Sequence, residues 1–428
     1  MLRWILDIWE IEELRKKFLY TLGILAIYRL GVHIPLPGIN TAALEQFFNQ
    51  FQQSIFMLYN MFSGGALGKM TVFALGILPY ITASILMQML VAAVPQLKRL
   101  QTEEGDYGRY KIDEYTKYLT LLIATIQAVF LTIWLQNQTT PDGTPLVYNP
   151  GIAFTVTAVV ILTAGAMFVT WLGDRITKHG IGNGPSILIF AGIVAGFPAM
   201  VAQMINNFRA GENSIIDVVI VILAVLAIIV GIVIIQEAER RIPIQYPQRN
   251  LGFGAPQMSY LPIKLNPVSV MPIIFAQAIL VMPATLVTMF HIEKLAFLKD
   301  WLNYQSPVYN AIYVALIIIF TYIYASIVVN PQDIAENLRK AGAFIPGVRP
   351  GKETEEYLAT VINRLLFVGA IFLAVIAIIP TIISIKLHIP FYFGGTTALI
   401  TVGVALDTLH RIEGHITMRK YYRFLGKS

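Results

Sequence analysis

The sequence predicts an all-α polytopic membrane protein with ten transmembrane helices in two five-helix halves. Only 13% of the 428 residues are charged, against about 25% in a soluble domain, and 56% are hydrophobic. Apolar runs of about 20 residues, long enough to cross the hydrocarbon core as helices, recur along the chain. A break near 206–213 divides the runs five and five, as in proteins built from two pseudo-symmetric repeats.

The N-terminal segment 1–17 alternates acidic and apolar residues and closes with Arg15, Lys16 and Lys17. This pattern predicts an amphipathic helix at the cytoplasmic membrane surface. The basic cluster leads into the first expected span, Phe18–Leu36, without a small-residue cleavage site. We therefore do not expect a cleavable signal peptide.

The first span and four more make up the N-terminal half, 18–205, and five others make up the C-terminal half, 215–409. An external hinge at 206–214 separates the halves, and a cytoplasmic tail covers 410–428. Between the first two spans, the segment 41–68 is too polar to face lipid, so we expect a partly inserted or re-entrant element there. The nine later spans are expected at Thr71–Val94, Tyr118–Leu135, Ile152–Leu172, Ser186–Ile205, Ile215–Ile235, Val268–Phe290, Ala311–Val329, Leu365–Ile385 and Phe391–Leu409.

The distribution of basic residues orients these spans. With the N-terminus inside, 25 of the 31 Lys and Arg residues lie on the cytoplasmic side. In membrane proteins, the loops on the cytoplasmic side carry an excess of Lys and Arg. Both termini are therefore expected to be cytoplasmic. The two long loops, 236–267 and 330–363, also fall inside. They either follow this charge rule alone or dock a large partner, and their length favours docking.

Several chemistries are excluded or disfavoured. The chain has no cysteine, so disulfides and thiolate metal sites are absent. The His-Glu-x-x-His, Gly-x-Ser-x-Gly and nucleotide-loop motifs are absent too, so we expect no enzyme, no cofactor and no metal.

The expected spans hold almost no ionisable residue, and Arg29 is expected to extend its charge towards the outer surface. This scarcity weakens the main alternative, a secondary transporter with five-plus-five repeats. An intramembrane protease ranks third, because nucleophile and metal motifs are lacking. Uncharged polar residues do occur in the spans, and taken alone Thr82, Gln127, Asn266 and Gln277 are most simply read as contacts between helices.

Six strings, in this order and spacing, are typical of one family. They are His33-Ile-Pro-Leu-Pro-Gly-Ile39, Asn60-Met-Phe-Ser-Gly-Gly-Ala-Leu67, Phe73-Ala-Leu-Gly-Ile-Leu-Pro-Tyr80, Gly180-Ile-Gly-Asn-Gly184, Gly342-Ala-Phe-Ile-Pro-Gly-Val-Arg-Pro-Gly351 and Phe391-Tyr-Phe-Gly-Gly-Thr396. Almost the whole chain resembles the SecY family, the channel-forming subunits of the Sec protein translocon.

The resemblance implies two five-helix halves around an hourglass pore, closed outside by a short plug near 55–68. The plug corresponds here to Asn60, Met61, Phe62, Ser63, Gly64, Gly65, Ala66 and Leu67. A ring of aliphatic side chains at the constriction corresponds to Ile77, Ile81, Ile189, Ile274 and Ile400. A sixth position of the ring is Pro185 here, which predicts a differently shaped helix start.

The resemblance further implies a lateral gate with a polar cluster at Thr82, Gln127 and Asn266. It implies that the two cytoplasmic loops dock the ribosome or the SecA motor ATPase, through Arg349 in the second loop and through Arg240, Arg241 and Arg249 in the first. The expected partners also include SecE, SecG, membrane lipid, and secretory or membrane-protein chains with signal sequences. The expected function is passage of unfolded chains across the cytoplasmic membrane and sideways release of apolar helices into lipid.

Overall fold

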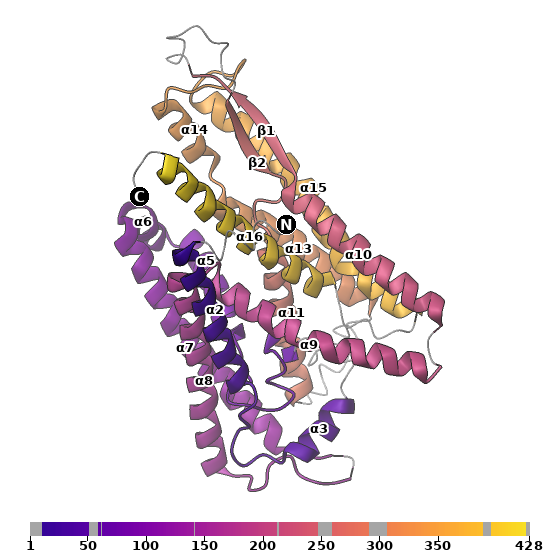
Figure 1. The fold of residues 1–428 in the computed structure, drawn as a ribbon. Coiled ribbons are helices and arrows are strands. Elements are labelled where there is room, and N and C mark those ends of the chain that lie inside the picture. The colour runs from indigo at the N-terminus through magenta and orange to yellow at the C-terminus, as the bar shows by residue number, and fades with distance from the viewer. Residues whose placement is uncertain are drawn as a thin grey trace. The chain divides into compact units, whose positions relative to one another are not determined.

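The computed structural model describes residues 11–50, 59–60, 62–140, 142–211, 214–246, 259–290, 306–387 and 395–424 (Figure 1). They fall into two compact units, which are considered separately. Unit 1 contains Met1–Ile215, Gln277–Tyr309 and Val404–Ser428, and unit 2 contains Ile216–Ala276 and Asn310–Gly403.

Unit 1 is built on long helices from the first half of the chain. These are α2 (Glu12–Gly31), α3 (Thr41–Gln50), α5 (Leu78–Ala93), α6 (Pro95–Glu103), α7 (Gly105–Gln136), α8 (Ile152–His179) and α9 (Gly184–Arg209). Helices α5, α7 and α8 pack in succession, with α7 between the other two (Figure 1). Their core includes Leu135 and Leu162, both fully buried, and extends to Leu44 of α3.

Unit 2 combines helices with a β-ribbon that the all-α prediction missed. Its elements are α10 (Ile215–Glu237), β1 (Glu239–Ile244), β2 (Ser259–Lys264), α11 (Met271–Phe290), α13 (Pro307–Val328), α14 (Pro331–Lys340), α15 (Lys352–Leu387) and α16 (Gly395–Phe424). Helices α11, α13 and α16 are divided between the units, and the first residue of α10 belongs to unit 1. Strands β1 and β2 are antiparallel, in a register that pairs Glu239 with Lys264. Ile242 and Ile244 are both buried and lie two residues apart on β1, so their side chains point to the same, apolar face of the ribbon.

Each of the ten expected spans overlaps a helix, but their ends differ. Helix α2 already includes residues 12–17, so this part of the expected surface helix is continuous with the first span. The second span is helical only from Leu78, because the preceding residues form turns and Gly76 has a φ of +56°. Helices α7 and α15 begin earlier than expected, at Gly105 and Lys352.

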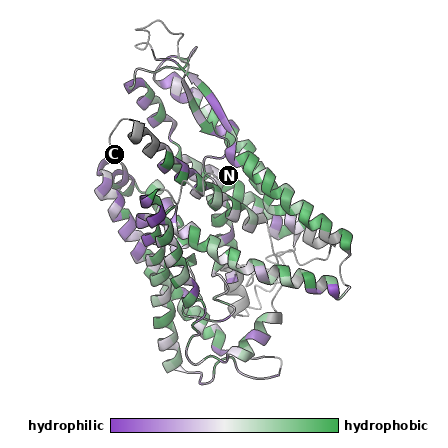
Figure 2. Cartoon of the chain, in the orientation of Figure 1, coloured by the Kyte–Doolittle hydropathy of each residue, from purple (hydrophilic) through white to green (hydrophobic). Residues whose placement is uncertain are grey.

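Among the described residues, six helices are long and apolar enough to cross a membrane. A seventh span results if α5 and α6, bent by 104° at their junction, count as one. The number ten therefore stays a prediction. Figure 2 shows hydrophobic residues along nearly all of α10, where Leu223 and Ile234 are at least 60% exposed. Such a surface suits lipid contact.

The turn between α8 and α9 matches the Gly-rich string of the sequence. Gly182 has a φ of +86°, a backbone region that favours glycine, and the Asn183 side chain caps α9 by accepting a hydrogen bond from the amide of Ser186. Pro185 occupies the first turn of α9, where a missing amide costs little. Helix α9 therefore begins as an ordinary capped helix with Pro185 in its first turn. The expected difference in shape from other members of the family stays a prediction.

Candidate functional site

Among the residues expected to form the plug, Asn60 and Phe62 are helical, and 63–67 form turns that follow them, between α3 and α5. Asn60 closes these turns, because its Oδ1 accepts a hydrogen bond from the amide of Gly68 at 2.7 Å. The hydroxyl of Ser63 donates to the Asn60 carbonyl at 2.9 Å and accepts from the amide of Leu67 at 3.1 Å. These side-chain bonds add to backbone bonds such as that from the amide of Gly65 to the carbonyl of Asn60, at 2.8 Å. Met61 lies outside the described residues.

The plug segment is buried inside unit 1. Ser63 and Ala66 are each 0% exposed. Just beyond them, the chain pairs with the segment that follows α2, where the Leu36 amide donates to the Met70 carbonyl at 2.9 Å. Non-helical backbone at membrane depth requires such protein surroundings.

The five isoleucines expected at the constriction are all buried, with exposures of 6% or less. They lie at the start of α5 (Ile77 and Ile81), on α9 (Ile189), on α11 (Ile274) and on α16 (Ile400). The first three belong to unit 1 and the other two to unit 2. Ile77 precedes the first turn of α5, so the plug and the first ring positions are joined by one short stretch of chain.

The three expected gate residues make local contacts or none. The hydroxyl of Thr82 donates to the carbonyl of Leu78 in its own helix at 3.1 Å. Oε1 of Gln127 is buried and has no hydrogen-bond partner among the described residues. Nδ2 of Asn266 donates to the Ser269 carbonyl at 2.9 Å, while its Oδ1 is buried and unpaired in the same part of the chain.

Asn266 therefore has a local role that sequence reasoning missed. Ser269 has a φ of +52°, which is unfavourable for a residue with a side chain. The bond from Asn266 supports this turn directly before α11, the helix that carries Ile274.

The two long loops that are expected on the cytoplasmic side meet within unit 2. The amide of Gln245 donates to the carbonyl of Phe344 at 2.9 Å, and the Phe344 amide donates back at 3.0 Å. This bridge brings the β-ribbon to the turn that carries Arg349, whose side chain is 87% exposed and lies 3.8 Å from Glu353. Arg240 and Arg241 are exposed on β1, and Arg249 lies outside the described residues.

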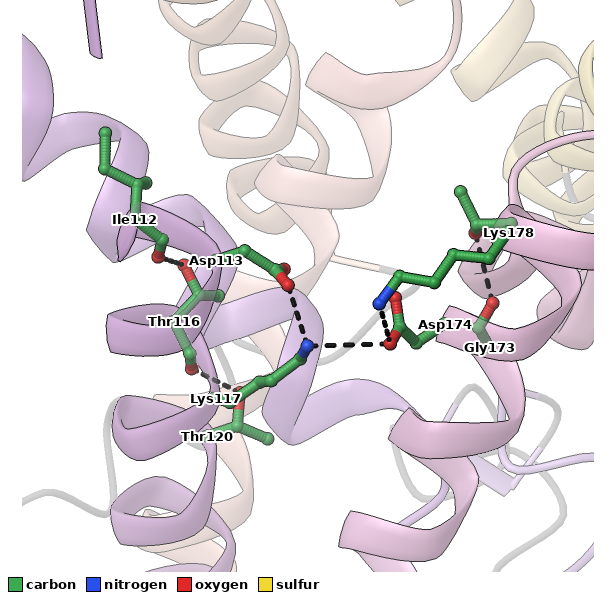
Figure 3. Close-up of polar contacts among 9 residues, drawn as sticks. Ile112, Asp113, Thr116, Lys117, Thr120, Gly173, Asp174 and Lys178 are labelled. Carbon is green, nitrogen blue, oxygen red and sulfur yellow. Dashed lines mark hydrogen bonds and ion pairs between the residues drawn. The ribbon is translucent and has the colours of Figure 1, made fainter. Parts of the chain in front are cut away.

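A charged cluster that sequence reasoning missed links α7 to α8 (Figure 3). Nζ of Lys117 lies 2.7 Å from Oδ2 of Asp113 and 3.5 Å from Oδ2 of Asp174. Asp174 also pairs with Lys178 at 2.9 Å. The two pairs within single helices have a spacing of four residues, which a sequence search can find. The bond between the helices depends on their packing.

A family model described as SecY matches residues 71–409, most of the chain. The chain belongs to the SecY family. Its relatives named "Protein translocase subunit SecY" include one from Aquifex aeolicus (strain VF5), 53% identical, with 98% of both chains covered. Another, from Escherichia coli (strain K12), is 40% identical and covers 97% of this chain and 95% of its own. The resemblance inferred from the six strings is thereby confirmed.

Solved structures support the SecY fold independently. One described as "The structure of a protein conducting channel" has a TM-score of 0.69 and 18% sequence identity, covering 93% of this chain and 91% of its own. "Sec61 in the Canine ribosome-channel complex from the endoplasmic reticulum" has a TM-score of 0.65 and 17% identity, with the same coverage. At these identities, the likeness concerns the fold.

Within this SecY-family chain, unit 1 joins the plug to Ile77 and Ile81, and unit 2 joins the two basic loops. The ring and gate positions are distributed over both units. Their roles as ring and gate therefore remain proposals.

Proposed function

We propose that this chain is the protein-conducting channel of a Sec translocon, which passes unfolded secretory chains across the cytoplasmic membrane and releases apolar helices into lipid. One observation carries this proposal beyond family membership. A non-helical segment, 63–76, is held in part by the side chains of Asn60 and Ser63, is largely buried in unit 1 and leads directly into Ile77 and Ile81. This arrangement suits a plug beside a constriction.

The proposed constriction is an apolar ring of Ile77, Ile81, Ile189, Ile274 and Ile400. Aliphatic side chains offer no ligand to an ion, and a narrow apolar pore stays dry. The same side chains can part around a passing chain of any sequence. Ten spans in two halves would supply the helices around such a pore.

We further propose that the lateral gate includes Thr82, Gln127 and Asn266. Buried amide oxygens without partners, as in Gln127 and Asn266, are costly in a fixed structure. They suit a gate that exchanges contacts when an apolar signal segment enters.

Energy must come from partners, and the basic cytoplasmic surface of unit 2 is the proposed docking site. The exposed Arg240, Arg241 and Arg349 can attract either ribosomal RNA or an acidic motor protein such as SecA. "Cryo-EM structure of idle yeast Ssh1 complex bound to the yeast 80S ribosome" describes a chain of similar fold, with a TM-score of 0.62 and 17% identity. SecE and SecG are proposed as the small membrane partners. The excess of basic residues supports cytoplasmic placement of both termini.

A secondary transporter, the alternative raised by the five-plus-five division, is not favoured. Transporters of that kind place charged or strongly polar residues at the midplane, and the apolar ring positions offer none.

Reconstitution tests the proposed function. The chain would be placed in lipid vesicles with SecE, SecG and the SecA motor, and an unfolded secretory protein would be added with ATP. Protection of that protein from external protease is expected only with all components and an intact signal sequence. Uptake of small solutes without any protein uptake would contradict the proposal and restore the transporter.

A further inference from the structure

The last turn of α2 contacts the plug segment through two consecutive side chains. The hydroxyl of Tyr28 donates to the carbonyl of Ser63 at 3.0 Å. Nη1 of Arg29 donates to the next carbonyl, that of Gly64, also at 3.0 Å. Both bonds join residues 35 positions apart in the sequence, so they fasten one segment of unit 1 to another.

Tyr28 is held rigidly for this contact. Its side chain is 1% exposed, and its ring stacks on that of Phe73 with 6.1 Å between centroids. Gly31 lets Phe73 come this close, because an added Cβ would lie 1.9 Å from the Phe73 ring. The hydroxyl is therefore aimed at Ser63 before any partner or substrate binds.

Arg29 uses its charge in an unexpected way. From the sequence, its charge is expected to extend towards the outer membrane surface. In the structure, its guanidinium binds a carbonyl of the plug segment. Among the described residues it forms no ion pair. A charged donor generally makes a stronger hydrogen bond than a neutral one, so the charge of Arg29 favours this contact.

Gly64 makes the close contact possible. Its φ is +68°, and a Cβ added there would lie 3.1 Å from both the Tyr28 hydroxyl and the Cα of Gly192. A side chain at this position would push the plug away from α2 and from α9 together. The three segments thus meet at a point that only glycine fits without strain.

We propose that Tyr28 and Arg29 are positioning residues that latch the plug in its seat and so set the threshold for opening. This inference rests on the proposed function, because a latch matters only where the plug must leave. The two bonds join α2 to the plug backbone, so they must break when the plug moves. Their loss would raise the population of the displaced plug, by about three- to tenfold for each bond at the usual net strength of a hydrogen bond.

The first test measures the plug directly, without translocation. Hydrogen exchange of the amides in 63–68 would be compared in the parent, Tyr28→Phe, Arg29→Met and the double variant, all in lipid nanodiscs. Tyr20→Phe is the matched control, since Tyr20 lies on the same helix and is 40% exposed. Arg29→Lys keeps the charge and is expected to restore part of the protection.

We expect exchange in 63–68 to rise about threefold or more in each single variant and further in the double, with α7 and α8 unchanged. Unchanged exchange at 63–68 would overturn the latch, and so would equal acceleration throughout unit 1, which would indicate a general loss of folding. The second test is the export of substrates with weak signal sequences, expected to rise in the same order. If plug exchange rises while neither the parent nor any variant exports protein, the latch stands and the proposed function fails.

Discussion

Oδ1 of Asn60 lies 2.7 Å from the backbone nitrogen of Gly68 and accepts its hydrogen bond, which closes the plug segment on itself. The close fit is specific, because a Cβ added to Gly68 would lie 2.9 Å from Nδ2 of Asn60. One side chain thus fixes both ends of the buried turns.

Asn60→Ala is predicted to loosen the plug. Leaving the half-buried Gly68 amide without its partner costs about 1 kcal/mol. The chain has no cysteine, so a single Ala66→Cys, at a position that is 0% exposed, can report on plug opening. Its labelling by a water-soluble thiol reagent should rise at least fivefold with Asn60→Ala. Asn137→Ala, which removes an exposed side-chain bond, serves as control, and equal labelling in both would refute the role of Asn60.

Charge reversal of Arg349 is predicted to block transport without unfolding the chain. The side chain is 87% exposed, so Arg349→Glu removes little packing, but it reverses the charge on the proposed docking surface. Protein import into vesicles is expected to fall at least tenfold at unchanged membrane abundance. Arg109→Glu, which changes a side chain that is 73% exposed and lies outside the two loops, is the control. Normal import by Arg349→Glu would remove this residue from the docking surface.

Widening the proposed ring is predicted to make resting membranes leak. Replacing Ile81, Ile189 and Ile274 together with Gly would let water enter the constriction. A matched triple on the same helices, Val91, Ile187 and Ile273 to Gly, removes side chains that are equally buried. Planar-bilayer conductance should rise only in the first triple. A similar rise in both would show that general loosening, and not the ring, causes the leak.

Two gate residues are predicted to differ in their effect on stability. Gln127→Leu removes a buried unpaired oxygen and should be neutral or stabilising. Asn266→Leu removes the bond to the Ser269 carbonyl and should destabilise the chain by about 1 kcal/mol. Thermal unfolding in detergent would measure both.

The double variant Gln127→Leu and Asn266→Leu should also change how hydrophobic a signal sequence must be for export. The corresponding change in the affinity for a given signal sequence is at most about tenfold. Thr321→Val is the control, because Thr321 is buried but bonds within its own helix. If the signal hydrophobicity needed for export is the same in the double variant and the parent, both amides are ordinary contacts between helices and not parts of a gate.

Much of the fold could be predicted from the sequence, because lipid imposes long apolar helices that periodicity and length reveal. The polarity of 41–68 predicts a partly inserted element there for the same reason, whereas the assignment of a plug to 60–67 came from the resemblance to the SecY family. Helix ends were less predictable. Gly76 delays the start of α5, and the polar N-terminal part of α15 gives no apolar signal.

The sequence could not predict contacts that depend on packing between distant segments. The sequence around Tyr28 and Arg29 does not indicate their hydrogen bonds to the plug carbonyls, because those carbonyls belong to residues 35 positions later in the chain. The bridge between Gln245 and Phe344, and the pair of Lys117 with Asp174, depend in the same way on the folded arrangement. The β-ribbon was detectable, since Ile242 and Ile244 alternate with polar or exposed residues.

Passage of a chain through the ring is tested most directly by disulfide cross-linking to a stalled substrate. Single cysteines would be placed in this cysteine-free chain at Ile81, Ile189 or Ile274 and, as a control, at the buried Ile273. A secretory protein with one cysteine, halted midway by a folded domain, would then be oxidised in place. We predict cross-links from all three ring positions and none from Ile273. Efficient translocation with no cross-link at any ring position would contradict the proposed path.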